Sequence, residues 1–453
     1  MAEQKSQDEH ISVAVRLRPF VPHEVGNACF SFSDGDQVNV IPSAVPAGHE
    51  KEGPWKYDHA LDSSALRGQV ISNAQCYDIV GRSLLTHALE GFNVCLFCYG
   101  QTGTGKTTTV LGDEKNGKGV LLLLLADLFQ RVSDMEQTGS KVNVKMQVLE
   151  VYNEQVFDLL ANAGKDKKQK IELHVLPGGV QIKGAETKEV QSVDQCQAYI
   201  NQANRLKHIA ATYMNPQSSR GHTVFKFVIE QDGQDGIHST SEMYFADLAG
   251  HENEKTTHVT GQQLVELSFI NKSLMWLQSA IHALAATKKV HGKKTSPQLS
   301  QFRNSKLTLL LCNALTGDSL INVIVTVSPA AEHFGTSLSS LKFANEVKRI
   351  HIEAHSSSHM DPHVVIKRLE DEVKSLKEQL ATPSGADVPV DNLTRQNQEL
   401  REQLESFRTA FQELSMQRDE LSEKLNQSQG VGDEEGARGL AKEEGSRAGG
   451  WAK

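Results

Sequence analysis

The strongest chemical feature of this sequence is a glycine-rich loop at residues 100–107. The loop has the sequence GQTGTGKT, which matches the pattern G-x-x-x-x-G-K-[ST]. Glycines let the backbone curl so that successive N–H groups point at phosphate oxygens, and the N-terminus of a following helix adds positive potential. In such a loop Lys106 neutralises the β- and γ-phosphates and Thr107 binds Mg²⁺. The loop therefore predicts a site for a Mg-nucleotide.

Two polar segments further along the chain could complete this site. Residues 215–222 (NPQSSRGH) place hydroxyls, an amide and a guanidinium in one loop, and residues 247–252 (DLAGHE) follow an apolar run. An aspartate at the end of a strand holds Mg²⁺ through water, and a glycine allows close approach to the γ-phosphate. Asp247 and Gly250 are the candidates, so the three segments together indicate a nucleotide switch.

The elements that must position these segments are strands and helices in alternation. This pattern predicts an α/β domain in which helices cover a sheet. The apolar runs that we interpret as strands are 11–15, 94–99, 142–151, 223–229, 242–248 and 321–327.

Composition excludes several classes of protein. The 453 residues carry a formal net charge of −9, so the chain does not coat nucleic acid, and they contain no apolar stretch long enough to span a membrane. Six cysteines in a chain without a secretory signal indicate reduced thiols in a cytoplasmic protein. Cys95 and Cys98 have a C-x-x-C spacing, but on a buried strand they face opposite sides, which favours core residues over a redox or zinc site.

The last hundred residues differ in composition. We expect a linker at 353–362, short heptads at 363–381, a break at 382–390, longer heptads at 391–427 and a disordered tail at 428–453. Two apolar positions per heptad favour an α-helical coiled coil that forms a homodimer. A single amphipathic helix on another surface is the alternative interpretation.

Beyond these motifs, the first 352 residues resemble the kinesin motor family segment by segment. The resemblance implies a tail at 1–8, a motor domain at 9–352, and a P-loop NTPase fold whose central sheet is mixed, mostly parallel and covered by helices on both faces. The segments that carry it are 13–19 (VAVRLRP), 100–107, 215–222, 247–252, 270–274 (INKSL), 302–308 (FRNSKLT), 327–329 (VSP) and 341–344 (LKFA).

The resemblance also implies catalytic roles at matching positions. Asn215 and Ser218 would contact the γ-phosphate and the attacking water. Gly250 would sense the γ-phosphate. Arg220 and Glu252 would form the salt bridge that closes the two switch segments for hydrolysis. Catalysis of this kind rests on positioning and on charge stabilisation.

Metal and nucleotide contacts carry over in the same way. Ser219 would join Thr107 and Asp247 around Mg²⁺. The residues expected to contact ATP are Arg16, Arg18, Pro19, Gly100, Gln101, Thr102, Gly103, Thr104, Gly105, Lys106, Thr107 and Thr108.

Several residues depart from the family pattern. Thr108 stands where an aromatic residue or histidine usually stacks on adenine, and Gly221 and His251 replace serines of the switch segments. We interpret His251 as a bystander rather than as a source of pH sensitivity. The departures at Val265, Leu267 and Leu309 replace residues on the family's microtubule face, which predicts weaker, less salt-dependent binding to acidic tubulin.

A lysine-rich loop offers compensation for those losses. It contains Lys288, Lys289, His291, Lys293 and Lys294. Such a loop creates a local positive field on an acidic chain, which favours a tether for acidic tubulin tails over a merely solvated loop.

The implied function is an ATP-dependent microtubule motor, a microtubule-stimulated ATPase that is plus-end directed and acts on the cytoskeleton in the cytoplasm with an unidentified cargo. The alternative is a kinesin-fold module that binds microtubules with weak or no ATP turnover. A small-GTPase-like switch is a third reading, but no N/T-K-x-D motif follows the switch segments, since Asn271-Lys272 lacks the aspartate.

Overall fold

The fold is described here from a computed structural model. It describes residues 6–24, 26–47, 52–65, 70–161, 169–176, 179–214, 220–233, 236–251, 262–285, 289–290, 293–294, 299–316 and 319–360. Further along the chain, only isolated positions are described: 374, 395, 398, 402, 405 and 409. Residues Glu3–His359 form one compact unit.

One half of the central sheet is parallel. Its order is β16-β7-β19-β2-β6, and every neighbouring pair in it runs parallel. Apolar runs buried on both faces are typical of such strands. The bounds are β2 (Ser12–Leu17), β6 (His59–Asp62), β7 (Asn93–Tyr99), β16 (Ile237–Asp247) and β19 (Ser319–Val327).

The other half of the sheet is antiparallel, with the order β13-β12-β11-β10-β15-β16. The prediction of a mixed sheet is confirmed, but the prediction that most of it is parallel is wrong. Short connections such as 233–236, between β15 and β16, join antiparallel neighbours because a parallel pair needs a long crossover. The bounds are β10 (Lys141–Tyr152), β11 (Gln155–Asp158), β12 (Gln169–Leu176), β13 (Gly179–Lys183), β14 (Lys188–Val190) and β15 (His222–Asp232).

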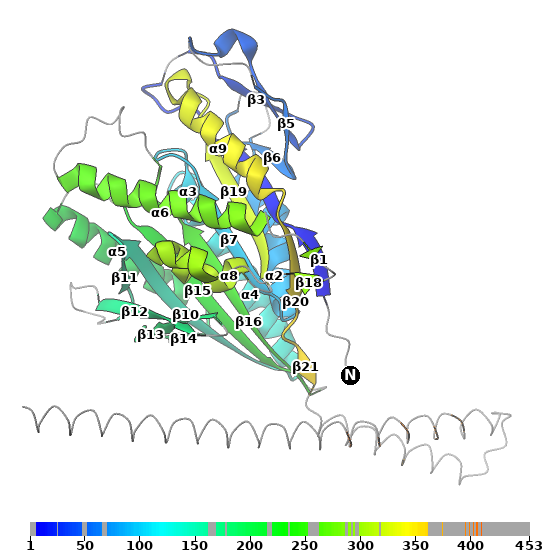
Figure 1. Ribbon diagram of the computed structural model, residues 1–453. Coiled ribbons are helices and arrows are strands. Elements are labelled where there is room, and N and C mark those ends of the chain that lie inside the picture. Colours follow the sequence, from blue (N-terminus) through cyan, green and yellow to red (C-terminus); the bar gives the residue numbers. More distant parts are fainter. Residues whose placement is uncertain are drawn as a thin grey trace, which may run out of the picture. The chain divides into compact units, whose positions relative to one another are not determined.

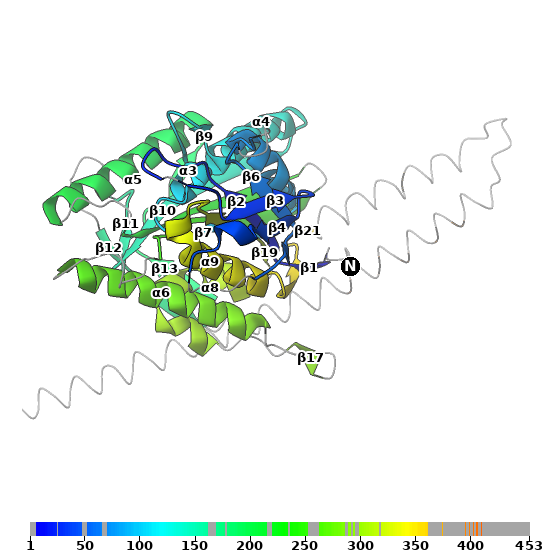
Figure 2. The same cartoon turned by 90° about the horizontal axis from the view of Figure 1, so that it is seen from above.

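Helices cover both faces of this sheet (Figures 1 and 2). One face packs against α1 (Asn73–Cys76), the π-helical turn η2 (Tyr77–Gly81), α2 (Arg82–Leu89), α4 (Val120–Gln137) and α5 (Val193–Met214). The other packs against α6 (Gln262–Ala285), α7 (Lys306–Leu310), α8 (Cys312–Thr316) and α9 (Phe334–Val347). Cys95 and Cys98 are buried in opposite cores, as the alternation of the strand predicts.

Smaller elements surround this frame. A three-stranded sheet contains β3 (Phe30–Ser33), β4 (Gln37–Val40) and β5 (Trp55–Lys56). Two hairpins are formed by β8 (Gly112–Asp113) with β9 (Gly117–Lys118), and by β17 (Lys289–Val290) with β18 (Lys293–Lys294). The remaining pieces are η1 (Pro42–Ala44), α3 (Lys106–Val110), η3 (Leu299–Asn304), η4 (Ala331–His333) and β21 (His359–Met360).

Both ends of the expected motor domain differ from the sequence analysis. Strand β1 (Ser6–His10) pairs antiparallel with β20 (His351–His355), from Ser6 opposite His355 to His10 opposite His351. Residues 6–8, expected in a tail, and 353–355, expected in a linker, therefore belong to a paired edge. The buried side chains of Ile352 and Ala354 anchor this edge to the core.

The predicted coiled coils at 363–381 and 391–427 lie outside the described residues apart from the isolated positions. No helix within the described part of the chain is both long and apolar enough to cross a membrane.

Candidate nucleotide site

The glycine-rich loop joins the end of β7 to the start of α3. Its glycines adopt positive φ angles of 150° at Gly100, 78° at Gly103 and 96° at Gly105. A Cβ on Gly100 would lie 2.4 Å from the backbone oxygen of Thr326, so only glycine lets the loop leave the sheet here. Lys106 is buried, and its Nζ donates to the carbonyl oxygens of Gly100 and Gln101 at 2.9 Å each. The loop thus holds a buried cation above the end of the sheet.

A hydroxyl and a carboxylate meet beside this lysine. Thr107 Oγ1 donates to Asp247 Oδ2 at 2.7 Å, which joins the first turn of α3 to the end of β16. The parallel pairing of β16 with β7 brings Asp247 to this edge, where it lies opposite Cys98. Asp247 Oδ1 is buried and has no hydrogen-bond partner within the described residues. The structure therefore brings together two of the three predicted Mg²⁺ ligands.

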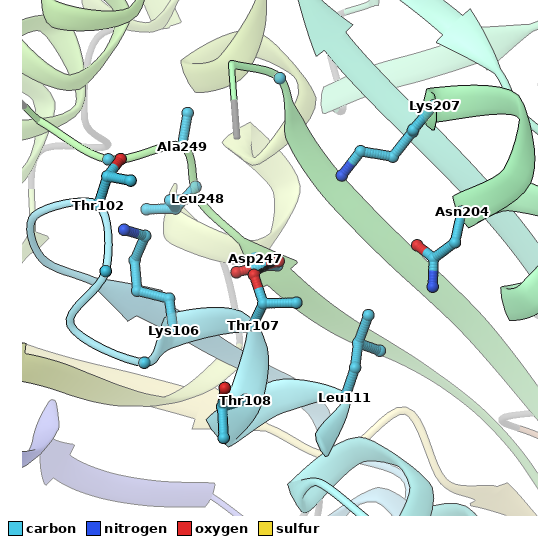
Figure 3. Close-up of a pocket in the computed structure, with 14 residues that line it drawn as sticks. Thr102, Lys106, Thr107, Thr108, Leu111, Asn204, Lys207, Asp247, Leu248 and Ala249 are labelled. Atoms are coloured by element: carbon cyan, nitrogen blue, oxygen red, sulfur yellow. Dashed lines mark hydrogen bonds between the residues drawn. The ribbon is translucent and has the colours of Figure 1, made fainter. Parts of the chain in front are cut away.

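These residues line one cavity of about 330 Å³. Figure 3 shows Lys106, Thr107 and Asp247 side by side, with Leu248 and Ala249 beyond them. Gly250 also lines the cavity, as do the loop residues Thr102, Gly103, Gly105 and Thr108. A concave site with a cation, a carboxylate and several backbone N–H groups is suited to a polyphosphate with its metal ion.

Helix α5 contributes two residues that the sequence analysis missed. Asn204 and Lys207 line the cavity opposite the loop, and Figure 3 shows both side chains extending from α5. Lys207 Nζ donates to Thr223 Oγ1 at 2.5 Å, and Thr223 is paired with Asp247 across β15 and β16. The sequence offered one signal for Asn204 and Lys207, which is their i, i+3 spacing just before the polar segment 215–222. A second cation therefore faces the site.

Arg220 forms a buried ion pair with Glu266 in α6. The side chains are 12% and 2% exposed, respectively, and the hydroxyl of Tyr152 donates to Glu266 Oε1 at 2.9 Å. Burial, together with this bond to Glu266, raises the pKa of Tyr152 to about 12. The expected partner of Arg220, Glu252, lies outside the described residues. The observed contacts join β10, α6 and the start of β15 at one point.

Two histidines near the site are held neutral. His222 is buried, its Nδ1 accepts from Ala249 N at 3.1 Å, and its Nε2 lies 2.8 Å from Ser273 Oγ. Burial lowers the pKa of His222 to about 3. His251 stacks on Tyr99 with ring centroids 5.0 Å apart, and burial, with a contribution from Lys106, lowers the pKa of His251 to about 4. Both imidazoles therefore stay uncharged near neutral pH.

Three of the residues expected to contact ATP, Arg16, Arg18 and Pro19, lie outside this cavity. Arg16 is buried and donates to Ser63, Asn73 and Thr109 side chains at 2.8–3.0 Å. Arg18 forms an ion pair with Glu24. Burial opposes ionisation of Glu24, but hydrogen bonds from Arg18 and Val21 N lower its pKa to about 2. Neither arginine, nor the exposed Pro19, is among the described residues that line the cavity.

Arg18 is nevertheless connected to the phosphate loop. His333 Nε2 lies 3.4 Å from Glu24 Oε1, and Gln101 Nε2 donates to His333 Nδ1 at 3.1 Å. This chain of contacts fixes the loop that carries Arg18 and Pro19 beside the start of the phosphate loop. Thr104 is buried within that loop, where its Oγ1 donates to Gln101 O at 2.7 Å.

The comparison with protein families settles which family this site belongs to. The model of the kinesin motor domain matches residues 16–350, which is most of the chain. The chain belongs to the kinesin motor family. This confirms the recognition and the motor fold that the motifs predicted.

Individual kinesins are similar over the same region. The chain is 31% identical over 448 residues to kinesin-like protein KIF13A of Mus musculus, covering 94% of the chain, and 32% identical over 390 residues to KIF1A of Rattus norvegicus, covering 83%. It spans 24% and 23% of the length of these two relatives.

Solved kinesin structures share the fold. One is a KIF14 dimer with AMP-PNP in complex with a microtubule, with a TM-score of 0.69 and 32% identity, over 78% of this chain and 98% of that one. Another is described as a fast kinesin, with a TM-score of 0.67 and 28% identity, over 78% of this chain and 95% of that one.

Four of the predicted kinesin site residues lie outside the described residues: Asn215, Ser218, Ser219 and Glu252. Gly221 directly follows Arg220, and a Cβ there would lie 2.6 Å from Glu150 Oε1. The glycine that replaces the usual serine thus makes room for a buried carboxylate.

The departures on the expected microtubule face divide into two groups. Val265 is 54% exposed on α6. Leu267 and Leu309 are only 7% and 6% exposed, so both side chains are buried, and Leu309 belongs to a large hydrophobic cluster. The expectation that all three are contact residues is therefore wrong for the two leucines, because the helix turns Leu267 inward and α7 packs against α6.

Proposed function

We propose that this chain is an ATP-dependent motor that couples Mg-ATP hydrolysis to movement along microtubules. The observation that carries the proposal is the single cavity in which Lys106, Thr107 and Asp247 meet. Membership of the kinesin motor family supports it, as do the KIF14 complexes with microtubules, one with AMP-PNP and one with ADP.

The donor set fits Mg²⁺. The Thr107 hydroxyl and the buried Asp247 Oδ1, which has no hydrogen-bond partner among the described residues, are oxygen donors of the kind that this ion takes. The hydroxyl stands on the first turn of α3, the helix that follows the loop. When bound, Mg²⁺ would neutralise charge on the β- and γ-phosphates. Ser219, on the segment after α5, is the third residue that we assign to it.

The protein's own residues supply position and charge. Lys106 presents its ammonium to the phosphates, and the N-terminus of α3 adds N–H donors. Gly250 leaves room for the γ-phosphate at the cavity wall. Arg220, held by Glu266, orients the segment in which Asn215 and Ser218 would position the phosphate and the attacking water. Glu252 would accept Arg220 when the switch segments close.

The microtubule surface that we propose includes the outer side of α6. Val265 and Met275 are 54% and 48% exposed on this helix. The lysine-rich hairpin follows α6 in sequence, with Lys289 opposite Lys294 in its register. Its positive charge suits acidic tubulin tails. Residues beyond 362 would form the homodimer, and we place the protein on the cytoskeleton in the cytoplasm, plus-end directed and with unidentified cargo.

A second candidate is a microtubule-binding module with weak or no turnover. Thr108 favours it, because a threonine at the cavity cannot stack on adenine as an aromatic side chain does, and such stacking is worth about 0.5–1.5 kcal/mol. The assembled loop, with Lys106, Thr107 and Asp247 in contact range, favours the motor.

Steady-state ATPase activity of the full chain, with and without polymerised tubulin, tests the proposal. We expect strong stimulation by microtubules that is lost in Arg220→Ala. The matched control is Arg205→Ala, which removes an exposed arginine of α5 that does not line the cavity. Microtubule binding without stimulated turnover would instead establish the binding module.

A further inference from the structure

The segment that follows α9 stays bound to the core. After β20, the three consecutive serines Ser356, Ser357 and Ser358 lie against the turn between α2 and β7, which contains Glu90 and Gly91. We call these three residues the serine clasp. Both the clasp and its partners belong to the compact unit Glu3–His359.

Every hydroxyl of the clasp is bound to the core or to another hydroxyl of the clasp. Ser356 Oγ donates to Glu90 O at 2.6 Å and lies 2.8 Å from Ser358 Oγ, which is 3.0 Å from the same carbonyl oxygen. Ser357 Oγ lies 3.1 Å from Gly91 O, contacts Thr240 O, and accepts from Thr240 N at 3.1 Å. The backbone N–H of Ser357 also donates to Gly91 O at 2.9 Å.

Gly91 makes this close approach possible. Its φ of 88° lies in the left-handed region, and a Cβ at this position would lie 2.5 Å from Ser358 Oγ and 2.8 Å from Ser356 Oγ. The turn and the clasp therefore fit each other as a pair, and the fit leaves no room for a side chain at position 91.

The partners of the clasp are mostly acceptors. The carbonyl oxygens of Glu90, Gly91 and Thr240 face the three hydroxyls, so the contact depends on hydroxyl protons. A phosphoserine has lost the Oγ–H proton and carries about two negative charges with further acceptor oxygens. Such a group opposite carbonyl oxygens is repelled and cannot replace the lost donors.

Ser357 is the exposed member of the clasp, whereas Ser356 is 1% exposed. We propose that Ser357 is a phosphorylation site and that its modification opens the clasp. A serine protein kinase would transfer the γ-phosphoryl group of ATP: the bond from Ser357 Oγ to phosphorus forms, the bond from phosphorus to the β–γ bridging oxygen breaks, ADP leaves, and the hydroxyl proton passes to the kinase base.

The consequence concerns the segment that connects the core to the rest of the chain. Once the clasp is open, the remaining described contacts of this segment include the pairing of β20 with β1, the buried side chains of Ile352 and Ala354, and the pairing of β21 with β16. The inference rests on the proposed function in one respect only: in a motor, opening the clasp would release that segment independently of the bound nucleotide. The contact itself, and its sensitivity to phosphate, do not depend on motor activity.

Hydrogen–deuterium exchange of the full chain tests the inference. Phosphoserine is incorporated genetically at position 357, and exchange is followed in peptides covering 351–358. We expect exchange there to be about tenfold faster or more, because several hydrogen bonds of the clasp are lost together. The matched control carries phosphoserine at Ser133, which is exposed on α4. Unchanged exchange with phosphoserine at position 357 would overturn the proposal.

A variant without charge separates geometry from electrostatics. Gly91→Ala should also speed exchange at 351–358, since its Cβ overlaps two clasp hydroxyls. Ser357→Ala should have a smaller effect than phosphoserine, and an effect of equal size would overturn the role of the phosphate charge. The measurement uses neither microtubules nor ATP turnover, so its failure is distinct from failure of the motor proposal.

Discussion

Glu266→Gln tests whether the buried ion pair between Arg220 and Glu266 stabilises the fold at the site. The change keeps the shape of the side chain and an acceptor for Tyr152, but it removes the negative charge that faces Arg220. Removing one member of a buried pair costs ~3–5 kcal/mol, because the other charge loses its compensation. Arg220 keeps 12% exposure, so we expect a loss of about 3 kcal/mol in the free energy of unfolding.

Urea denaturation of the full chain measures this loss, and a double-mutant cycle isolates the pair. Arg220→Met, alone and combined with Glu266→Gln, should give a coupling energy of about 2 kcal/mol. Tyr152→Phe should cost about 1.5 kcal/mol, since it removes one hydrogen bond to a carboxylate. Glu230→Gln is the matched control: its pair with Lys145 is 40% and 28% exposed, and it should contribute under about 1 kcal/mol.

A coupling energy near zero between Arg220 and Glu266 would refute this reasoning. It would mean that the two charges are well solvated, or that another carboxylate replaces Glu266 without cost. If the coupling energy is large but the microtubule-stimulated ATPase activity is unchanged, the ion pair stabilises the fold and has no role in ATP turnover.

Three further predictions follow from the site. Asp247→Asn should weaken the apparent affinity for Mg²⁺ in the ATPase reaction by about 10–100-fold, measured by Mg²⁺ titration at fixed ATP. Burial lowers the pKa of His222 to about 3, so the contribution of His222 to the free energy of unfolding is fully present above pH 6.5. At lower pH the unfolded state takes up a proton that the folded state does not, and about 2 kcal/mol of the free energy of unfolding is lost at pH 5. His222→Gln should flatten this pH dependence in urea titrations. Val265→Lys should tighten microtubule binding about two- to fivefold at low salt in co-sedimentation, whereas Leu267→Lys should destabilise the fold.

Each of these has its own control. Asp113→Asn alters a carboxylate outside the cavity and should leave Mg²⁺ dependence unchanged. His238→Gln alters a histidine whose side chain is 38% exposed, and a change in slope equal to that of His222→Gln would contradict the burial argument. A soluble, stable Leu267→Lys protein with tighter microtubule binding would show that Leu267 faces outward.

The phosphate loop could be predicted from the sequence because its requirements are local. The apolar run before Gly100 predicted β7 to within one residue, and the glycines mark the positions with positive φ. The contact of Thr107 with Asp247 could also have been predicted, since Thr107 follows β7 and Asp247 ends β16, and these parallel strands end at the same edge of the sheet.

Other features were not within reach because they depend on distant elements. Glu266 lies 46 residues from Arg220, and only the packing of α6 against the sheet brings them together. Leu267 was expected on the surface because it stands at a position that faces the microtubule in the kinesin family, but helical periodicity turns it into the core. Ser356–Ser358 were expected in a flexible linker, since a polar run says nothing about carbonyl oxygens supplied by a turn 266 residues earlier.

Two polar contacts connect α6 to the start of β15: Arg220 with Glu266, and His222 with Ser273. Arg220 and His222 are two residues apart at the start of β15, and Glu266 and Ser273 are seven residues, or about two helical turns, apart on α6. Both pairs therefore lie along one line. We expect the segment before β15 to move in response to the γ-phosphate. Such a movement must either displace α6 along its length or break the buried ion pair between Arg220 and Glu266. Because α6 also carries the exposed Val265, such a displacement would reach the surface that we propose for the microtubule.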